Sequence, residues 1–502
     1  MAVTADHVAK RPELAAIREH MIIDGKPVKK GEGTVPVYDP ATGKVIAQQV
    51  EAGAKQVDAA VRAARKALES PEWRNFLPSG RERLLLKLAD KIEEEGDTLA
   101  RLETLNNGKT LALSKMIEVD AGAQWLRYMA GWATKIRGDT LDISFPFPPG
   151  VKYHVYTRRE PVGVVGAIVP WNFPMLMGIW KMAPAIAAGC TVVLKPAEET
   201  PLTAIRLAEL ALEVGFPPGV FNVITGRGEI TGAALVAHPG VNKIAFTGST
   251  EVGKILRRAS ADDMKRLSLE LGGKSPMVIM DDCPIELAVQ GAIMGGFFNQ
   301  GEVCTCGSRL LIQDGIYDKV TQGLAQAVNG MKVGSGFDAD TQIGPLVSKR
   351  QLDRVVGYID AGRADGARVL AGGSAIDGDG YFVRPTVFAD APETASIVRE
   401  EIFGPVVVAS RFKTEEEAIR KANDTPYGLG ASVWSNDEGR IQRLSRGIQA
   451  GTVWVNCHNV VDPNMPFGGY KQSGFGREHG RNVMDLYLET KSVCVAYGGT
   501  AG

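Results

Sequence analysis

Short apolar runs alternate with helical periodicity along the chain, and this alternation most constrains its fold. Apolar side chains recur at helical spacing in residues 54–68, 80–94, 204–214 and 285–294. Between these segments lie apolar runs bounded by Gly, Pro or Lys, at residues 163–169, 191–194, 220–223, 243–246 and 276–279. Strands that alternate with helices at this spacing predict a parallel sheet covered by helices.

The same pattern begins again after residue 276 and predicts a second unit. A chain of 502 residues exceeds the length at which one hydrophobic core usually divides. The predicted fold class is therefore α/β, with a Rossmann-like parallel-sheet unit and a second α/β unit. We expect the first to span residues 1–140 and 160–271, and the second residues 272–472.

Residues 162–180 carry no charged side chain and approach the length of a membrane span. Pro170, Asn172 and Pro174 lie close together in the middle of this stretch, and a spanning helix would tolerate them poorly. We predict instead a buried strand over residues 162–169 that enters an apolar loop, and no membrane association.

Charge and cysteine content argue against several classes of protein. A formal net charge of −1 gives no reason to expect nucleic acid or an anionic membrane as a partner. The six cysteines form no CxxC pair and no zinc-ligand spacing with the six histidines, so no metal is expected. Residues 1–20 lack the apolar core of a secretory signal. Reduced thiols and a cytoplasmic location are therefore predicted.

A cysteine and a glutamate, in two glycine-containing segments, carry the clearest chemical signal. Cys304 lies in residues 298–309, and Glu270 precedes it in residues 269–274. A thiol can attack a carbonyl group, and a carboxylate can then activate water to release the acyl group. Alone, Cys304 could be a core thiol and Glu270 a solvated surface group. Their order and spacing favour catalysis.

Together the two segments resemble the active-site signatures of the aldehyde dehydrogenase superfamily, and the resemblance extends over residues 21–497. It implies that the Cys304 thiolate attacks an aldehyde, that a hydride passes to NAD, and that Glu270 activates the water that cleaves the thioester. Asn172 and the backbone N–H of Cys304 would stabilise the oxyanion. Lys181 and Glu478 are candidates for a proton relay, with ordinary structural roles as the alternative.

The expected cofactor site rests on weaker local signals, because no G-x-G-x-x-G motif follows a strand. Gly248 to Gly253 follows the strand 243–246 and could open a helix that faces a pyrophosphate; a plain helix cap at Ser249 or Thr250 is the alternative. Glu198 would favour NAD over NADP. The resemblance implies the following cofactor-binding residues: Ile168, Pro170, Trp171, Lys195, Glu198, Gly228, Phe246, Gly248, Ser249, Val252, Leu271, Glu401 and Phe403.

The resemblance also implies an apolar and aromatic substrate pocket, which suits a hydrophobic aldehyde. Its expected lining is Phe173, Met177, Trp180, Val303, Thr305, Asn459 and Phe467. Residues 134–143, 171–180, 453–469 and 489–495 are similar to family members that oxidise phenylacetaldehyde in aromatic catabolism. The alternatives are a general or aliphatic aldehyde dehydrogenase, a thiol hydrolase, and a non-catalytic structural or binding protein that keeps the fold.

Two remaining segments predict strands. Side chains in residues 151–156 alternate as they do along a β-strand. Residues 488–497 are a second strand candidate, and an exposed strand edge there would need a covering partner. In the resembling family such segments join subunits. The resemblance therefore implies a small β bridging element over residues 141–159 and 473–502, and a homotetramer. An ordinary local sheet is the alternative.

Overall fold

The computed structural model describes residues 12–147 and 150–497, and its elements confirm the predicted α/β class. The predicted strands are β7 (Val164–Ile168), β8 (Thr191–Lys195), β9 (Phe221–Val223), β10 (Lys243–Thr247) and β12 (Pro276–Ile279). The predicted helices are α2 (Ala54–Glu69), α4 (Pro78–Glu94), α9 (Leu202–Glu213) and α12 (Ile285–Phe297). Parts of the first predicted unit and of the bridging element, residues 1–11, 148–149 and 498–502, lie outside the described residues.

The first sheet has the strand order β19-β11-β10-β7-β8-β9-β1-β2. Its further strands are β1 (Met21–Ile23), β2 (Lys26–Val28), β11 (Arg266–Glu270) and β19 (Gly474–Phe475). Neighbouring strands from β11 to β9 are parallel. From β7 the chain continues to β8 and β9 on one side, and then returns to β10 on the other. Such a reversal opens a crevice at the carboxyl ends of the strands, where ligands of α/β proteins bind.

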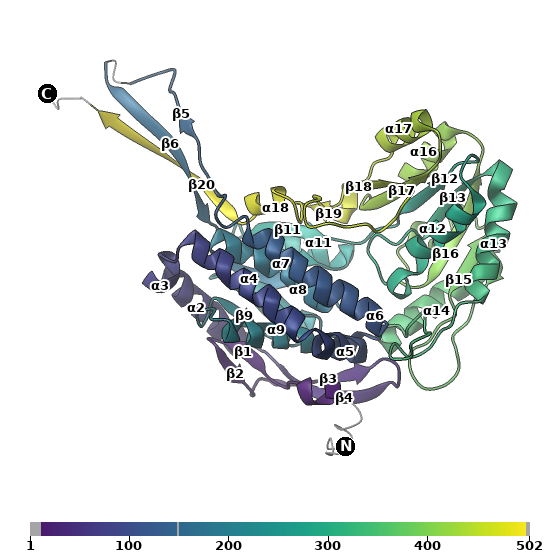
Figure 1. Cartoon of the computed structure of the whole chain (residues 1–502), viewed down its shortest axis with the longest axis horizontal. Helices are drawn as coiled ribbons and strands as arrows, with labels where there is room; N and C mark the ends of the chain where they lie inside the picture. The colour runs from purple at the N-terminus through teal and green to yellow at the C-terminus, as the bar shows by residue number, and fades with distance from the viewer. Residues whose placement is uncertain (1–11, 148–149, 498–502) are drawn as a thin grey trace.

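Helices cover both faces of this sheet (Figure 1). Alternate residues of β8 enter two different cores. Val192 and Leu194 pack with α4, α9 and α7 (Gly122–Ala130), whereas Val193 packs with α2 and α10 (Ala233–Ala237). The period of two along a strand explains this division. The remaining helical elements of this part are η1 (Pro12–Ala16), α3 (Pro71–Arg74), α5 (Gly96–Asn107), α6 (Leu111–Leu113), the π-helix η2 (Ser114–Ala121), the π-helix η3 (Gly228–Gly232) and α11 (Thr250–Ala259).

Helix α8 (Pro174–Ala188) corrects one prediction. The strand within residues 162–169 is confirmed, but the apolar loop after it ends at Phe173 and a helix follows. All fifteen residues of α8 are buried, so the sequence shows no amphipathic period. Pro174 occupies the first turn, where proline is tolerated. Among the described residues, no helix has both the length and the apolar character needed to cross a membrane.

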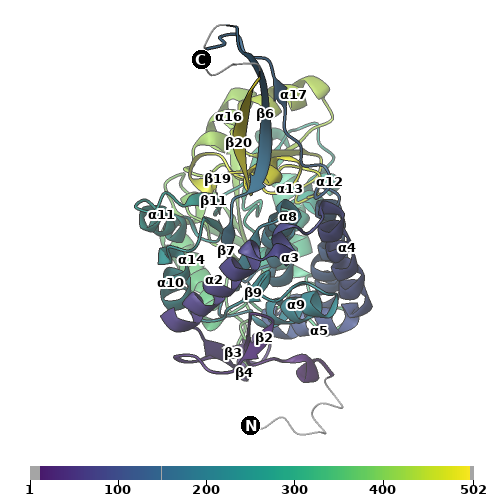
Figure 2. The same ribbon diagram turned by 90° about the vertical axis from the view of Figure 1, so that its left-hand side faces the viewer.

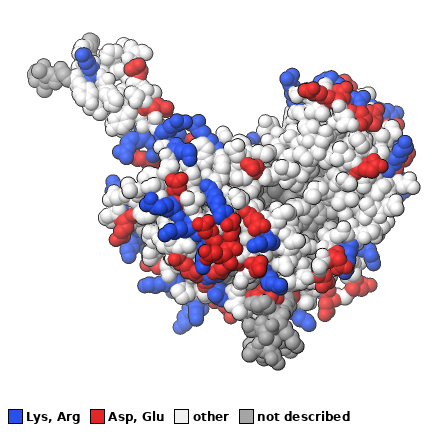
Figure 3. Space-filling model, viewed as in Figure 1, with Lys and Arg blue, Asp and Glu red and all other residues white. Residues whose placement is uncertain are grey.

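The second sheet has the order β14-β15-β16-β13-β12-β17-β18, and only its edge pair β14–β15 is antiparallel. Its further strands are β13 (Arg309–Gln313), β14 (Arg368–Ala371), β15 (Thr386–Ala389), β16 (Val406–Phe412), β17 (Gly430–Trp434) and β18 (Thr452–Val455). Its further helical elements are η4 (Phe298–Gly301), η5 (Asp314–Ile316), α13 (Tyr317–Asn329), α14 (Lys349–Ala364), α15 (Ser396–Arg399), α16 (Glu415–Asn423) and α17 (Glu438–Gly447). A hollow with mostly uncharged walls separates this part from the first (Figure 3).

A narrow three-stranded sheet projects from the body of the molecule (Figures 1 and 2). Strand β6 (Lys152–Pro161) lies between β5 (Thr140–Leu141) and β20 (Leu488–Tyr497), antiparallel to both. The two segments that predicted strands therefore pair with each other. Phe145 and Phe147, in the chain between β5 and β6, are 83% and 74% exposed. Short elements η6 (Lys471–Ser473) and α18 (Asn482–Asp485) precede β20.

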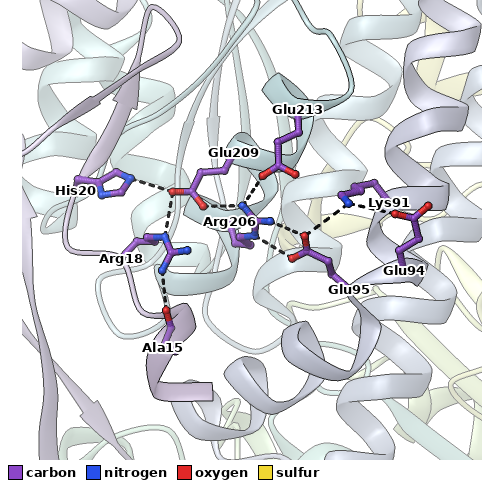
Figure 4. A network of polar contacts seen from close by, with 9 residues as sticks. All are labelled: Ala15, Arg18, His20, Lys91, Glu94, Glu95, Arg206, Glu209 and Glu213. Atoms are coloured by element: carbon purple, nitrogen blue, oxygen red, sulfur yellow. Dashed lines mark hydrogen bonds and ion pairs between the residues drawn. The ribbon is translucent and has the colours of Figure 1, made fainter. Parts of the chain in front are cut away.

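Charged side chains tie the N-terminal segment to the helices (Figure 4). Arg206 of α9 pairs with Glu95, which precedes α5, at 2.5 Å and with Glu209 and Glu213 at 2.8 Å. Glu209 also accepts from His20, which precedes β1, at 3.1 Å. The hairpin of β3 (Gly33–Asp39) and β4 (Lys44–Glu51) completes this side of the molecule.

Candidate active site between the two sheets

The segment that connects β11 to β12 brings Glu270 and Cys304 together. A Cβ atom at Gly273 would lie 2.4 Å from the Cys304 carbonyl oxygen, and one at Gly272 would lie 2.2 Å from Glu401 Oε2. Only glycine permits such approach. The Gly272-Gly273 pair thus packs directly against the backbone of the cysteine segment.

Glu270 is the last residue of β11 and is 4% exposed. Burial, and then the charge of Glu478, raise the pKa of Glu270 well above its usual range, against the opposing effect of Lys181. Its Oε2 atom has no hydrogen-bond partner among the described residues. β11 is absent from the predicted strands, although the alternation in residues 266–270 could have indicated it.

Cys304 follows a strained stretch of backbone. Asn299, Gln300 and Gly301 have φ angles of 48°, 57° and 69°, and left-handed residues in sequence are uncommon outside functional sites. Burial raises the pKa of the Cys304 thiol to about 12, and the nearby Glu401 and Glu270 add to this. The sulfur is therefore a neutral thiol at pH 7, and its activation needs a base.

Asn172 reaches the same place from the loop between β7 and α8. Its Nδ2 atom donates to the carbonyl oxygen of Glu302 at 2.9 Å. Its own backbone carbonyl accepts from Lys109 Nζ at 2.8 Å and from Asn299 Nδ2 at 3.2 Å. The asparagine is 3% exposed. The structure thus brings together the three residues predicted to be catalytic, although their roles stay predictions.

Lys181 and Glu478, the relay candidates, form a buried ion pair. Lys181 lies on α8, and Glu478 exchanges backbone hydrogen bonds with Phe467. Glu478 Oε2 has no partner among the described residues. Phe467 is followed by Gly468, where a Cβ atom would lie 2.8 Å from Glu270 Oε1, so the segment paired with Glu478 lies beside that carboxylate.

Most of the predicted cofactor residues gather at the carboxyl ends of β8, β7 and β10. Lys195 ends β8 and contacts Glu198 at 3.1 Å. Burial alone would raise the pKa of Glu198, but the Lys195 ammonium and hydrogen bonds hold it below its usual value. Ile168 ends β7, with Pro170 and Trp171 in the loop after it. Phe246 lies in β10 one residue before its end, Gly248 follows β10, and Gly228 begins η3. The side chain of Ser249 accepts from the Val252 N–H at 3.2 Å.

That hydrogen bond makes Ser249 the N-cap of α11, which was the alternative interpretation of this segment. The cap does not exclude a cofactor, because it satisfies only one of the free N–H groups of the first turn. A Cβ atom at Gly253 would lie 2.6 Å from Leu271, so this helix packs closely on the segment after Glu270. A larger residue than glycine at position 253 would push α11 away from Leu271.

The second sheet contributes Glu401 and Phe403 to this edge. Glu401 Oε1 accepts from the Gly273 N–H at 3.0 Å, and burial raises the pKa of Glu401 to about 7. Phe403 has a φ angle of 61°, and its ring lies edge-on to Trp171 with the centroids 5.1 Å apart. Glu401 and Phe403 of the second sheet thus contact residues that follow β11 and β7 of the first sheet.

Five predicted pocket residues belong to one apolar cluster, against which Cys304 packs. They are Phe173, Met177, Trp180, Val303 and Phe467. The other two, Thr305 and Asn459, are polar and are joined by a hydrogen bond of 2.8 Å from the Thr305 hydroxyl to Asn459 Oδ1. One residue was missed: the buried ring of His479 lies 3.9 Å from that of Trp180, centroid to centroid. Burial, and then Lys181, lower the pKa of His479 to about 3, so it is neutral.

Lys109 and Glu118 were also missed, although both side chains are 0% exposed and lie beside the Asn172 loop. No local sequence signal indicates such a pair, because its partners come from different elements. Among the described residues, no group of three His, Cys, Asp or Glu side chains could hold a metal ion.

Comparisons with known proteins show the family to which the chain belongs. The model of the aldehyde dehydrogenase family matches residues 28–493. Phenylacetaldehyde dehydrogenase of Pseudomonas fluorescens is 53% identical over 95% of this chain and 96% of that protein. Mitochondrial aldehyde dehydrogenase of Homo sapiens is 47% identical over 92% and 89%. The NAD+ complex of a Bacillus cereus aldehyde dehydrogenase superposes with a TM-score of 0.94 at 46% identity, over 97% of this chain and 99% of that one.

These matches confirm the family, the fold class and the expectation of an NAD-dependent enzyme. The chain belongs to the aldehyde dehydrogenase family.

Proposed function

We propose that the protein oxidises a hydrophobic aldehyde, with phenylacetaldehyde as the preferred substrate, through a thioester on Cys304. The observation that carries this proposal is the convergence of Cys304, Glu270 and Asn172 between the two sheets. A thiol, a buried carboxylate and an amide donor are the groups that acyl chemistry on an aldehyde needs.

The chain's own residues divide the steps among them. Cys304 loses its proton to a nearby base and attacks the aldehyde carbon. The Asn172 amide uses one N–H group on Glu302, which fixes its orientation, and offers the other to the oxyanion. NAD, when bound, accepts the hydride that leaves the substrate carbon. Glu270 then takes a proton from water, whose oxygen attacks the thioester, and the carboxylic acid and the Cys304 thiolate are released. The base that took the thiol proton returns it to Cys304.

Glu270 must pass that proton on before the next turnover. Glu478 is the nearby candidate, because one of its carboxylate oxygens has no partner among the described residues while the other holds Lys181. We propose that this pair relays the proton. Burial raises the pKa of Glu270, and the ionised carboxylate is correspondingly a stronger base toward water.

The proposed cofactor residues fit a dinucleotide on two grounds. The reversal between β7 and β10 puts the carboxyl ends of both strands at one crevice. Glu198, held ionised beside Lys195, can accept from ribose hydroxyls and would repel a 2′-phosphate. Glu198→Gln should therefore raise the ratio of kcat/KM with NADP to kcat/KM with NAD, and an unchanged ratio would refute this role.

Two features support the substrate. The pocket candidates Phe173, Trp180 and Phe467 offer aromatic surface around Cys304, and a relative with 53% identity is named for phenylacetaldehyde. For the domains, we propose a cofactor unit of residues 1–140 and 160–271, a catalytic unit of residues 272–472, and a bridging element of residues 141–159 and 473–502. For the assembly, we propose a homotetramer whose subunits are joined through the β5–β6–β20 sheet. Sedimentation as a monomer at working concentrations would refute the tetramer.

The test is a panel of initial rates of NADH formation with phenylacetaldehyde, benzaldehyde, hexanal, acetaldehyde and betaine aldehyde. We expect the highest kcat/KM for phenylacetaldehyde, and no NADH formation by Cys304→Ala. A flat profile, or a peak at an aliphatic or cationic aldehyde, would retain the chemistry and discard the substrate. Activity that survives Cys304→Ala would overturn the mechanism.

A further inference from the structure

A fully buried ion pair lies beneath the loop that carries Asn172. The side chains of Lys109 and Glu118 are both 0% exposed and contact each other through Nζ and Oε1. Taking two charges out of water is costly, and apolar residues of similar size often replace such a pair without loss of stability. The pair therefore calls for an explanation other than stability.

Each partner also binds one backbone group of the segment that begins at Asn172. Lys109 Nζ donates to the Asn172 carbonyl at 2.8 Å. Glu118 Oε2 accepts from the Leu176 N–H, in the first turn of α8, at 2.8 Å. Because Phe173 at the N-cap offers no side-chain acceptor, Glu118 serves in its place. The pair thus clamps the loop from residue 172 to residue 176.

The position of Glu118 depends on an irregular helix. It lies on the π-helix η2 (Ser114–Ala121), between the short helix α6 and α7. A π-turn rotates the residues after it relative to a regular helix, and such turns are frequent at functional sites. Burial, and then the charge of Glu118, raise the pKa of neighbouring Glu103 to about 8. Glu103 is thus neutral at pH 7 and does not compete for Lys109.

We propose that Lys109 and Glu118 are positioning residues, which hold the Asn172 amide where it can stabilise the oxyanion. This inference rests on the proposed function, because it requires Asn172 to be the oxyanion donor. Asn299 donates to the same Asn172 carbonyl, and Glu302 accepts from the Asn172 amide. The clamp adds to these contacts, and its loss would leave the Asn172 segment with fewer hydrogen bonds to fix the amide.

The test is a double-mutant cycle between Asn172→Ala and the charge-free pair Lys109→Met/Glu118→Leu. The double replacement avoids a lone buried charge, so the protein should fold with a thermal midpoint near that of the wild type. Two rates are measured: the NADH burst in a single turnover, and release of nitrophenol from an activated aryl ester, which needs no NAD. Asn172→Ala should slow both about 100- to 1000-fold.

The clamp variant should slow both rates at least about 10-fold with little change in KM, and should add almost nothing when Asn172 is already alanine. Rate losses that multiply, or an unchanged rate in the clamp variant, would overturn the inference while Asn172 keeps its role. Wild-type rates for Asn172→Ala would overturn the proposed function of Asn172 and the inference with it. Lys115→Met/Asp120→Asn removes an exposed pair on the same π-helix and serves as the matched control.

Discussion

Two buried lysine–glutamate pairs contact α8, and they differ in how completely their polar atoms are satisfied. In the Lys109–Glu118 pair, both carboxylate oxygens accept hydrogen bonds and the ammonium also holds a carbonyl. In the Lys181–Glu478 pair, Oε2 of the glutamate has no partner among the described residues.

The difference shows how buried lysine–glutamate pairs can have two roles, positioning of a loop and transfer of a proton. A satisfied buried network rigidifies what it touches, and the first pair touches the loop of Asn172. A buried carboxylate oxygen without a hydrogen-bond partner can accept a proton or a hydrogen bond from a molecule bound in the site. Glu270, near the second pair, has such an oxygen as well. We therefore assign positioning to the first pair and proton transfer to the second.

The largest expected effect is at Glu270, which lies near the Lys181–Glu478 pair and also has an oxygen without a partner among the described residues. Glu270→Gln should lower kcat about 100- to 10,000-fold, because general-base catalysis is lost. Burial raises the pKa of Glu270 in the folded state, so the folded protein binds a proton that the unfolded chain has released. Stability therefore falls as pH rises from the ordinary carboxyl pKa to the raised one. The variant should unfold at the same or a higher temperature at alkaline pH; loss of both activity and stability would indicate a structural carboxylate.

Substitutions in the Lys109–Glu118 pair should change the free energy of unfolding. Lys109→Met alone leaves Glu118 buried without its counter-charge, and the free energy of unfolding should fall by about 3–5 kcal/mol. Lys109→Met/Glu118→Leu should recover most of that loss. Lys181→Met should likewise lower stability, because it leaves Glu478 buried without its counter-charge. Denaturant titration measures all three, and equal losses in the first two variants would contradict the comparison.

A smaller effect is expected in the pH dependence. Glu270 acts as the base only when it is ionised, so the rate falls as pH falls through its pKa. Glu478 is, after burial, the next cause that raises this pKa. Glu478→Gln should thus move the acidic limb of kcat to lower pH, whereas Glu118→Gln should leave it in place. A shift of the acidic limb to higher pH in Glu478→Gln, or an equal shift in both variants, would refute the different roles assigned to the two pairs.

The smallest effect belongs to an exposed pair. Lys115 and Asp120 lie 3.8 Å apart with side chains 38% and 56% exposed. Their replacement by methionine and asparagine should change the free energy of unfolding by less than about 0.5 kcal/mol and leave kcat unchanged. A larger change in the same assays would mean that the π-helix itself, rather than its buried pair, is sensitive to substitution.

The regular parts of the fold were predictable because their residues follow the period of the element. The strands around β7 to β10 and helices such as α2 have bounded, periodic patterns. Helix α8 was missed because it is buried on every side and contains two prolines, so neither period nor composition indicates a helix. β11 is short, and its alternation was overlooked.

The site was predictable only where a motif is local. Cys304, Glu270 and Asn172 lie in recognisable segments, and the structure brings them together. The clamp of Lys109 and Glu118 depends on contacts between elements distant in sequence, and the left-handed backbone of Asn299 depends on the surrounding packing. Residues of this kind follow from tertiary structure alone.

The most direct measurement is the intact mass of Glu270→Gln after incubation with phenylacetaldehyde and NAD. If Cys304 forms the thioester and Glu270 removes it, the variant should accumulate one phenylacetyl group per chain. Peptide mapping should locate that group on Cys304. An unmodified variant, or an acyl group on another residue, would contradict the division of labour between the thiol and the carboxylate.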